Sequence, residues 1–126
     1  MISFPATVEI VAACRWNDTG IDLAAGQAYD LVAEGQWIDS TIVSGPDGNP
    51  DPVWSQRLLA GWLRAPGERY FTLIGALDRD RTSLFRIGTG TLYKPPRAGR
   101  LTCFANDVLG FYGNNHGAIR LTVALR

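Results

Sequence analysis

The apolar residues of this chain recur with a period of two, and this constrains the fold more than any other feature of the sequence. The alternation occurs in residues 7–11, 29–34 and 119–123. It places every second side chain on one face, which is typical of a half-buried strand. Turn-forming residues interrupt the chain at short intervals, for example at 47–50 and 94–99, and no long capped helical pattern occurs. We therefore predict an all-β fold, a small antiparallel β-sandwich.

Three segments depart from simple alternation. Residues 70–77 are apolar almost throughout, which predicts either a central strand covered on both faces or a strand whose outer face meets another subunit. This strand and the closing strand near the C-terminus lead us to expect a homo-oligomer. Residues 54–64 could form a helix, kept short by Gly61 and Pro66. The charge run 78–81 predicts a solvated hairpin turn.

Length and charge suit a compact domain. The chain has 126 residues, enough for one domain spanning residues 1–126. Its 12 Lys and Arg residues balance 12 Asp and Glu residues without forming a basic stripe, so we expect no nucleic-acid partner. No apolar run approaches the roughly 18–20 residues of a membrane span, and no signal-peptide pattern occurs, so we expect no membrane insertion. We expect cytoplasmic synthesis, with export by a non-classical route left open, and two buried thiols at Cys14 and Cys103.

Residues 106–115 carry the strongest functional signal. They bring together one carboxylate, Asp107, two carboxamides, Asn114 and Asn115, and two glycines that allow the chain to turn. Calcium takes roughly six to eight oxygens from carboxylates, amide and backbone carbonyls and water. These side chains and the Phe111 carbonyl would fill only part of that shell and leave positions for water or a sugar diol. The pattern predicts a Ca²⁺ site, although the same residue types dominate ordinary turns and a plain loop stays open.

The same loop resembles that of the calcium-dependent galactophilic lectins of the pseudomonad type. That family's loop reads Asn-Asp-Val-Pro-Gly-x-Tyr-Gly-Asn-Asn, and residues 106–115 match it except for Leu109 in place of proline. The likeness continues in residues 99–102 and 117–123 and is fainter upstream. The resemblance implies a lectin-like β-sandwich domain of the galactose-binding-domain-like or jelly-roll-like kind. It also implies a Ca²⁺ cofactor, a galactose-like glycan as partner and a homo-oligomer.

The resemblance further implies which residues act in such a site. The implied calcium ligands are the side chains of Asp107, Asn114 and Asn115 and the main-chain carbonyls of Phe111 and Asp39. The implied sugar contacts of the loop are Asp107, Val108, Asn114 and Asn115.

The segment that would read sugar identity departs from the family. The family uses a histidine and a glutamine there, and this chain has residues 49–54 instead. Asp51 could accept a hydrogen bond from a sugar, and Trp54 could stack on one or be an ordinary exposed indole. His116, the only histidine, is either a sugar contact or a plain surface residue. Two functions remain: a calcium-dependent carbohydrate-binding protein that grips vicinal hydroxyls of a galactose-like hexose, or a non-catalytic structural or interaction module with a degenerate sugar site.

We expect no enzymatic activity. His116 could in principle activate Ser83 or Cys103, but no nucleophile lies in a strand–turn–helix elbow and no glycine-rich phosphate loop precedes a helix. The carboxylates of Asp47 and Asp51 could hydrolyse a glycoside only across a cleft, for which a sandwich of this size leaves little room.

Overall fold

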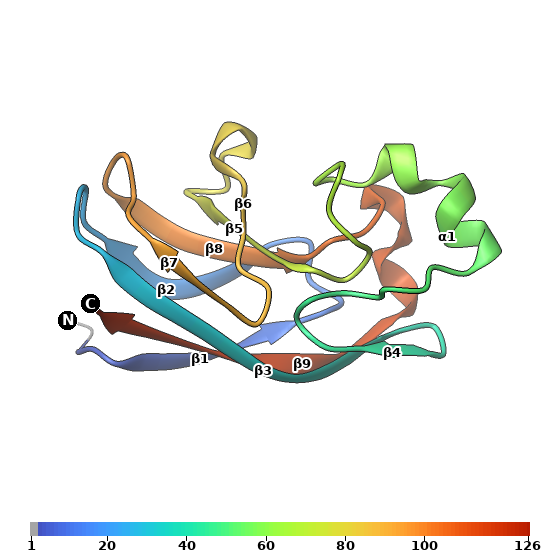
Figure 1. Cartoon of the computed structure of the whole chain (residues 1–126), viewed down its shortest axis with the longest axis horizontal. Coiled ribbons are helices and arrows are strands. Elements are labelled where there is room, and N and C mark those ends of the chain that lie inside the picture. Colours follow the sequence, from blue (N-terminus) through green and yellow to red (C-terminus); the bar gives the residue numbers. More distant parts are fainter. Residues whose placement is uncertain (1–2) are drawn as a thin grey trace.

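Two antiparallel sheets pack face to face in the computed structural model, which describes residues 3–126 (Figure 1). The first sheet has the strand order β1-β9-β3-β4, with β7 also paired to β3, and the second has the order β2-β8-β5-β6. The strands of the first sheet are β1 Ala6–Val11, β3 Tyr29–Asp39, β4 Ile42–Ser44, β7 Gly90–Tyr93 and β9 Asn115–Leu125. Those of the second are β2 Asn17–Leu23, β5 Leu73–Leu77, β6 Phe85–Arg86 and β8 Gly99–Ala105. The predicted all-β sandwich is confirmed.

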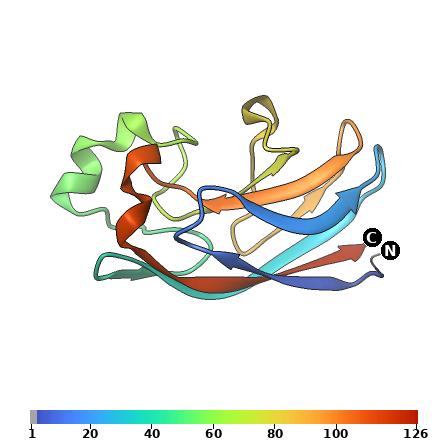
Figure 2. The ribbon, with the colours of Figure 1, turned by 180° about the vertical axis from the view of Figure 1, so that it is seen from behind.

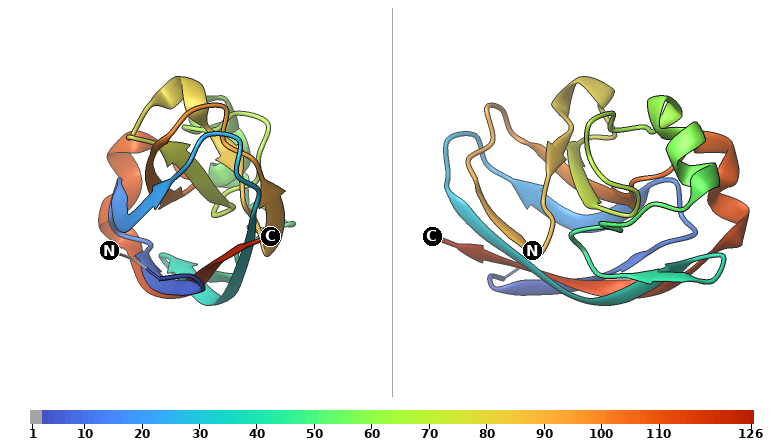
Figure 3. Two further views of the ribbon diagram at one scale, coloured as in Figure 1. Left: turned by 90° about the vertical axis from the view of Figure 1, so that its left-hand side faces the viewer. Right: turned by 45° about the vertical axis from the view of Figure 1, so that its right-hand side comes forward.

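The core lies between the two sheets, which are seen as separate layers in the left view of Figure 3. Period-two alternation sends one set of side chains inward, including Ile10, Leu31, Trp37, Leu101 and Leu121, all fully or almost fully buried. Burying an aliphatic side chain of this kind contributes about 1.5–3 kcal/mol relative to leaving it exposed. The alternation read from the sequence is therefore also the main source of stability.

Strand β5 is buried along its whole length, and its outer face is covered by the chain itself. Ile74 packs there with Ala65 and Phe104, and Trp16 and Leu84 lie against this second cluster. The first of the two sequence alternatives is therefore confirmed for residues 73–77, whereas residues 70–72 precede the strand because the chain bends at Phe71, whose φ is 63°. The apolar surface that we expected β5 to offer to another subunit is absent, and the homo-oligomer stays a prediction that rests on the resemblance.

Short helices lie at one end of the sandwich, away from both chain termini (Figures 1 and 2). The helix expected in residues 54–64 is split into α1, Trp54–Leu58, and the 3-10 helix η1, Ala60–Trp62. A longer 3-10 segment, η3, spans Leu109–Asn114 and joins β8 to β9 at the same end. None of the helices within residues 3–126 combines the length and apolar character needed to cross a membrane.

The two cysteines differ in environment. Cys103 is fully buried in β8, as predicted, but Cys14 is exposed, so the prediction of a buried thiol is wrong there. The reason is that β1 ends at Val11 and β2 begins at Asn17, which leaves Cys14 in the connecting turn. Both cysteines are free.

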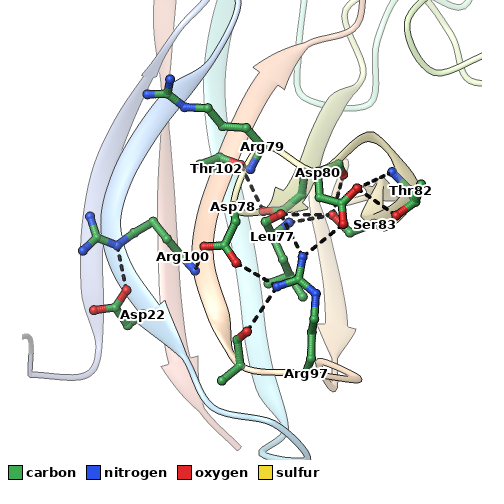
Figure 4. Close-up of polar contacts among 12 residues, drawn as sticks. Asp22, Leu77, Asp78, Arg79, Asp80, Thr82, Ser83, Arg97, Arg100 and Thr102 are labelled. Carbon is green, nitrogen blue, oxygen red and sulfur yellow. Dashed lines mark hydrogen bonds and ion pairs between the residues drawn. The ribbon is translucent and has the colours of Figure 1, made fainter.

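The charge run forms the turn between β5 and β6, as predicted, and it is tied to the β7–β8 connection (Figure 4). A 3-10 helix, η2, begins in it and spans Arg81–Ser83, and the Asp80 carboxylate accepts a hydrogen bond from the Thr82 backbone N–H. The Arg97 guanidinium donates to Asp78 at 2.7 Å and to Asp80 at 3.2 Å. These exposed ion pairs hold the turn against the segment that connects β7 in the first sheet to β8 in the second.

Candidate functional site

The loop between β8 and β9 is anchored by two buried side chains. The Asn106 carboxamide accepts from the Ala65 backbone N–H at 2.9 Å and donates to the Ala65 carbonyl at 3.1 Å. The Tyr112 hydroxyl donates to the Ala105 carbonyl at 2.6 Å, which ties the middle of η3 back to the end of β8. These bonds fold the loop so that Asp107 and Asn115, eight residues apart, meet across its base.

Asp107 is a buried carboxylate without a cationic partner in the described part of the chain. It is 2% exposed and accepts hydrogen bonds from the Val108 backbone N–H at 2.7 Å and from Asn115 Nδ2 at 3.1 Å. Burial, with a smaller contribution from the nearby charge of Asp39, raises the pKa of Asp107 to about 6. The site therefore holds a carboxylate whose charged form is unfavourable until a positive group approaches it.

Strand pairing brings Asp39 to this loop. Strands β3 and β9 stay in register from Tyr29 opposite Leu125 to Asp39 opposite Asn115. One residue further, the Ser40 backbone N–H donates to the Asn114 carbonyl at 2.9 Å. The alternation that builds the core thus also determines which residues meet at the end of the sandwich.

A pocket of about 390 Å³ opens between these elements. Asp39, Asp107, Phe111 and Asn114 line it together with residues from α1 and the segment before β5. Lysine, arginine and histidine are absent from its lining. A pocket of this volume can hold a small polar ligand such as a monosaccharide.

Two residues that the sequence analysis did not select, Gln56 and Tyr70, also line the pocket. Gln56 Nε2 donates to Asp39 at 2.8 Å, and its Oε1 accepts from Asn49 Nδ2 and from the Val53 backbone N–H. A glutamine therefore does reach the pocket, from a position just after residues 49–54, the segment in which we found no glutamine. No sequence signal marked Tyr70, because it belongs to an apolar run that predicts a strand.

Within residues 3–126, two buried side-chain polar atoms lack a hydrogen-bond partner, and both lie at this site. One is the hydroxyl of Tyr70, and burial, with smaller contributions from Asp107 and Asp39, raises its pKa to about 12. The other is Oδ1 of Asn115, whose Nδ2 donates to Ala12 and Asp107. Buried polar atoms are nearly always paired, so these two indicate a site for something that binds them.

The donor chemistry fits a hard cation such as calcium. Asp107 supplies a carboxylate, and Asp39, which was expected to act through its main-chain carbonyl, also places a carboxylate at the pocket. Asn114 and Asn115 supply carboxamides, of which the Asn115 oxygen has no other partner among the described residues. No group of three or more His, Cys, Asp or Glu side chains comes together in the part of the chain that the structure describes. A mixed set of carboxylate and amide oxygens is nevertheless what calcium uses, whereas zinc sites are built mainly from Cys sulfur and His nitrogen.

The remaining residues selected from the sequence lie outside this pocket. His116 lies next to Asn115 in β9 but is exposed, because successive residues of a strand face opposite sides of the sheet. Asp51 and Trp54 are exposed too, and Trp54 starts α1 with 77% of its surface accessible. Val108 pairs with Leu63 and is not part of the lining. Of the expected metal residues, Asp39, Asp107, Phe111 and Asn114 line the pocket, and Asn115 lies behind the lining in contact with Asp107. Val108, Asp51, Trp54 and His116 do not line it.

Comparison with known proteins gives two matches that span nearly the full chain. No known protein-family model matches the sequence. Lectin A of Photorhabdus laumondii is 29% identical over 132 residues, covering 98% of this chain and 88% of Lectin A. A solved structure described as the EclA N-terminal domain, a PllA-like lectin, superposes with a TM-score of 0.73 at 19% identity over 95% of each chain.

The chain therefore shares the fold of a PllA-like lectin. Both matches bear the name lectin, a term for carbohydrate-binding proteins without catalytic activity. The sequence similarity to a bacterial lectin agrees with the resemblance seen in residues 106–115. It also agrees with the prediction of a non-enzymatic protein.

Proposed function

We propose that this chain is a calcium-dependent carbohydrate-binding protein whose site is the pocket around Asp39, Asp107, Asn114 and Asn115. The observation that carries the proposal is the pairing of two uncompensated carboxylates with the two orphaned polar atoms, the Tyr70 hydroxyl and Asn115 Oδ1. A protein gains nothing for its own stability from such an arrangement. A ligand that combines positive charge with hydroxyl groups would satisfy every one of these groups. The similarity to Lectin A supports the same conclusion.

The residues at the pocket would have different roles in binding. Asp39, Asp107, Asn114 and Asn115 would hold a calcium ion, which when bound supplies open coordination positions for sugar hydroxyls. The Tyr70 hydroxyl, neutral at pH 7, can donate a hydrogen bond to a sugar oxygen. Gln56 Nε2 donates to the Asp39 carboxylate, which limits the orientations that this carboxylate can take.

The proposed ligand is a galactose-like hexose presented through two vicinal hydroxyls, as the family resemblance implies. Because Asp51 and Trp54 lie outside the pocket, Tyr70 and Gln56 are better candidates for reading sugar identity. Assembly into a homo-oligomer is part of the proposal, since it would turn weak single sites into useful avidity. Light scattering at high protein concentration would test this, and a strictly monomeric mass would remove it.

One observation favours the second candidate, a non-catalytic interaction module with a degenerate sugar site. The Gln56 carboxamide is satisfied within the protein, because it donates to Asp39 and accepts from Asn49 and Val53. A glutamine held in this way offers a sugar little without rearranging. The two candidates therefore differ in whether the pocket still binds a glycan once its metal is in place.

The first experiment measures calcium binding. Melting curves with and without millimolar calcium should show stabilisation of about 2.7 kcal/mol when calcium is present at 100 times its dissociation constant. Asp107→Asn should remove this response. Asp51→Asn, which neutralises an exposed carboxylate outside the pocket, should keep it. An unchanged melting temperature for the parent protein at saturating cation would refute the metal site.

The second experiment is a glycan array probed in calcium and in chelator. Calcium-dependent binding of galactose-type glycans, lost in Asp107→Asn and retained in Asp51→Asn, is the expected result. Calcium binding without binding to any glycan would instead select the interaction module.

A further inference from the structure

A second pocket lies beside η3 and shares no lining residue with the first. It has a volume of about 230 Å³, and Leu109, at the start of η3, is part of its wall. Three arginines, Arg15, Arg64 and Arg81, line it from three separate segments of the chain. Its lining contains no carboxylate. The two pockets on either side of η3 therefore have opposite charge.

No carboxylate of the described residues pairs with these three arginines. Across residues 3–126, five arginines form ion pairs with Asp or Glu: Arg86, Arg97, Arg100, Arg120 and Arg126. Arg15, Arg64 and Arg81 form none there, although the whole chain has equal numbers of acidic and basic residues. Three like charges at one pocket repel one another, so the arrangement favours an anion from outside.

Arg64 is held in place before any ligand arrives. Its guanidinium lies 3.6 Å from the centre of the Phe104 ring and 4.7 Å from that of Trp16. Its Nη1 donates to the Arg15 carbonyl and, at 2.9 Å, to the Tyr112 hydroxyl. Both bonds use the same nitrogen, so the N–H groups of Nε and Nη2 have no protein acceptor among the described residues. A fixed, planar guanidinium with free donors matches the geometry of an oxyanion.

The apolar side chains of the pocket wall indicate which class of ligand fits. Trp16, Leu84 and Leu109 supply apolar surface beside the arginines, which suits an anionic group carried on a ring or a short carbon skeleton. We propose that this pocket binds an oxyanion, a carboxylate, sulfate or phosphate group, and that Arg15 and Arg81 at its rim and Arg64 at its base provide the contacts. The proposal does not depend on calcium or on the first pocket. An acidic glycan is a ligand class that could bind either pocket, the first through its hydroxyl groups and this one through its anionic group.

The test is calorimetric titration in buffer stripped of calcium on a resin, because a dissolved chelator is itself an oxyanion. The probes are galacturonate, galactose as the neutral match, inorganic sulfate and inorganic phosphate. We expect galacturonate to bind and galactose not to bind. Binding of sulfate or phosphate as tightly as galacturonate would assign the site to free oxyanions, and weaker binding would assign it to acidic sugars. The absence of binding by all three anions at millimolar concentration would overturn the proposal.

Variants separate this pocket from general surface charge. The double variant Arg15→Gln, Arg81→Gln should weaken galacturonate binding by about tenfold or more, since charge-assisted bonds to two guanidiniums are lost. Arg79→Gln, which removes an exposed arginine away from the pocket, should change the affinity by less than about twofold. Equal weakening in both would mean that only net charge matters. Arg64 is left intact because its stacking also supports the fold, and unchanged melting curves would verify that the variants are folded.

Discussion

Two regions of this molecule hold carboxylates in opposite ways. In the turn at residues 78–81, exposed aspartates face arginines, and Arg97 alone bonds both Asp78 and Asp80 (Figure 4). In the pocket at the end of the sandwich, Asp39 and Asp107 both line the wall, and the lining has no cationic side chain. The carboxylates of the first region have cationic partners within the protein, and those of the second have none among residues 3–126.

The contrast separates a structural cluster from a binding site. The Arg100 backbone N–H and the Arg97 guanidinium hold the pKa of Asp78 below its usual value, so its charged form is stabilised by folding. Burial does the reverse to Asp107 and raises its pKa to about 6. A carboxylate that folding destabilises must be retained for a reason other than stability, and a bound cation is the simplest such reason.

The largest expected effect that tests this contrast is on the pH dependence of stability. Asp107 has a folded pKa of about 6 against 3.8 unfolded, so between these values the folded state binds more protons than the unfolded state. The contribution of Asp107 to the free energy of unfolding therefore falls by up to about 3 kcal/mol as pH rises from about 4 to 6, and it stays low at higher pH. Urea denaturation of calcium-free protein at a series of pH values measures it.

The variant that isolates this contribution is Asp107→Asn. The free energy of unfolding of the variant minus that of the parent should be more positive at pH 7 than at pH 4. The reason is that the parent loses stability when Asp107 ionises, whereas the asparagine does not ionise. Asp51→Asn should follow the parent at both values. A constant difference between Asp107→Asn and the parent across this pH range would mean that the carboxylate is already compensated, and the contrast between the two regions would disappear.

Most of the fold followed from the sequence because the physical cause is local. Alternation in residues 29–34 predicted the first half of β3, which extends to Asp39, and the same alternation determines which face is buried. The turn at 78–81 was predicted from its charges. Cys14 was misplaced because an apolar stretch after β1 looks like strand, whereas the chain turns there. What covers β5 could not be predicted from the strand itself, because Trp16 and Phe104 reach it from distant parts of the sequence.

Most of the site residues predicted from the sequence belong to one loop, residues 106–115. Asp107, Asn114 and Asn115 are close in sequence, so their residue types and spacing indicated an oxygen-rich site. Gln56 reaches the pocket only through the turn into α1, and Tyr70 reaches it because the chain bends at Phe71, whose φ is 63°. Neither bend has a strong sequence signature. Conversely, His116 is adjacent to Asn115 in sequence and yet faces away.

A smaller effect is expected from the orphaned hydroxyl. A buried hydroxyl without a partner costs about 1–3 kcal/mol, so Tyr70→Phe should raise the free energy of unfolding of the ligand-free protein by about 1 kcal/mol. Tyr112→Phe is the matched control, because the Tyr112 hydroxyl bonds both Arg64 and the Ala105 carbonyl. That variant should lower stability by about 1–3 kcal/mol. Chemical denaturation compares them, and a loss of stability in Tyr70→Phe would show that its hydroxyl is already satisfied.

The smallest effect is expected at the charge network itself. Arg97 and its partners are exposed, and ion pairs between exposed groups are screened by water and salt. Arg97→Gln should therefore change the free energy of unfolding at pH 7 several-fold less than the pH-dependent difference expected for Asp107→Asn. Because folding lowers the pKa of Asp78 and Asp80, the contribution exists above about pH 4 and is lost as pH falls below it. Arg79→Gln, an exposed arginine of the same turn without an ion pair, is the control. Denaturation at low salt and in 1 M salt should show the Arg97→Gln difference only at low salt. A large effect that persists in 1 M salt would mean that this network supports the fold as strongly as a buried site would, and exposure would no longer explain why the two regions differ.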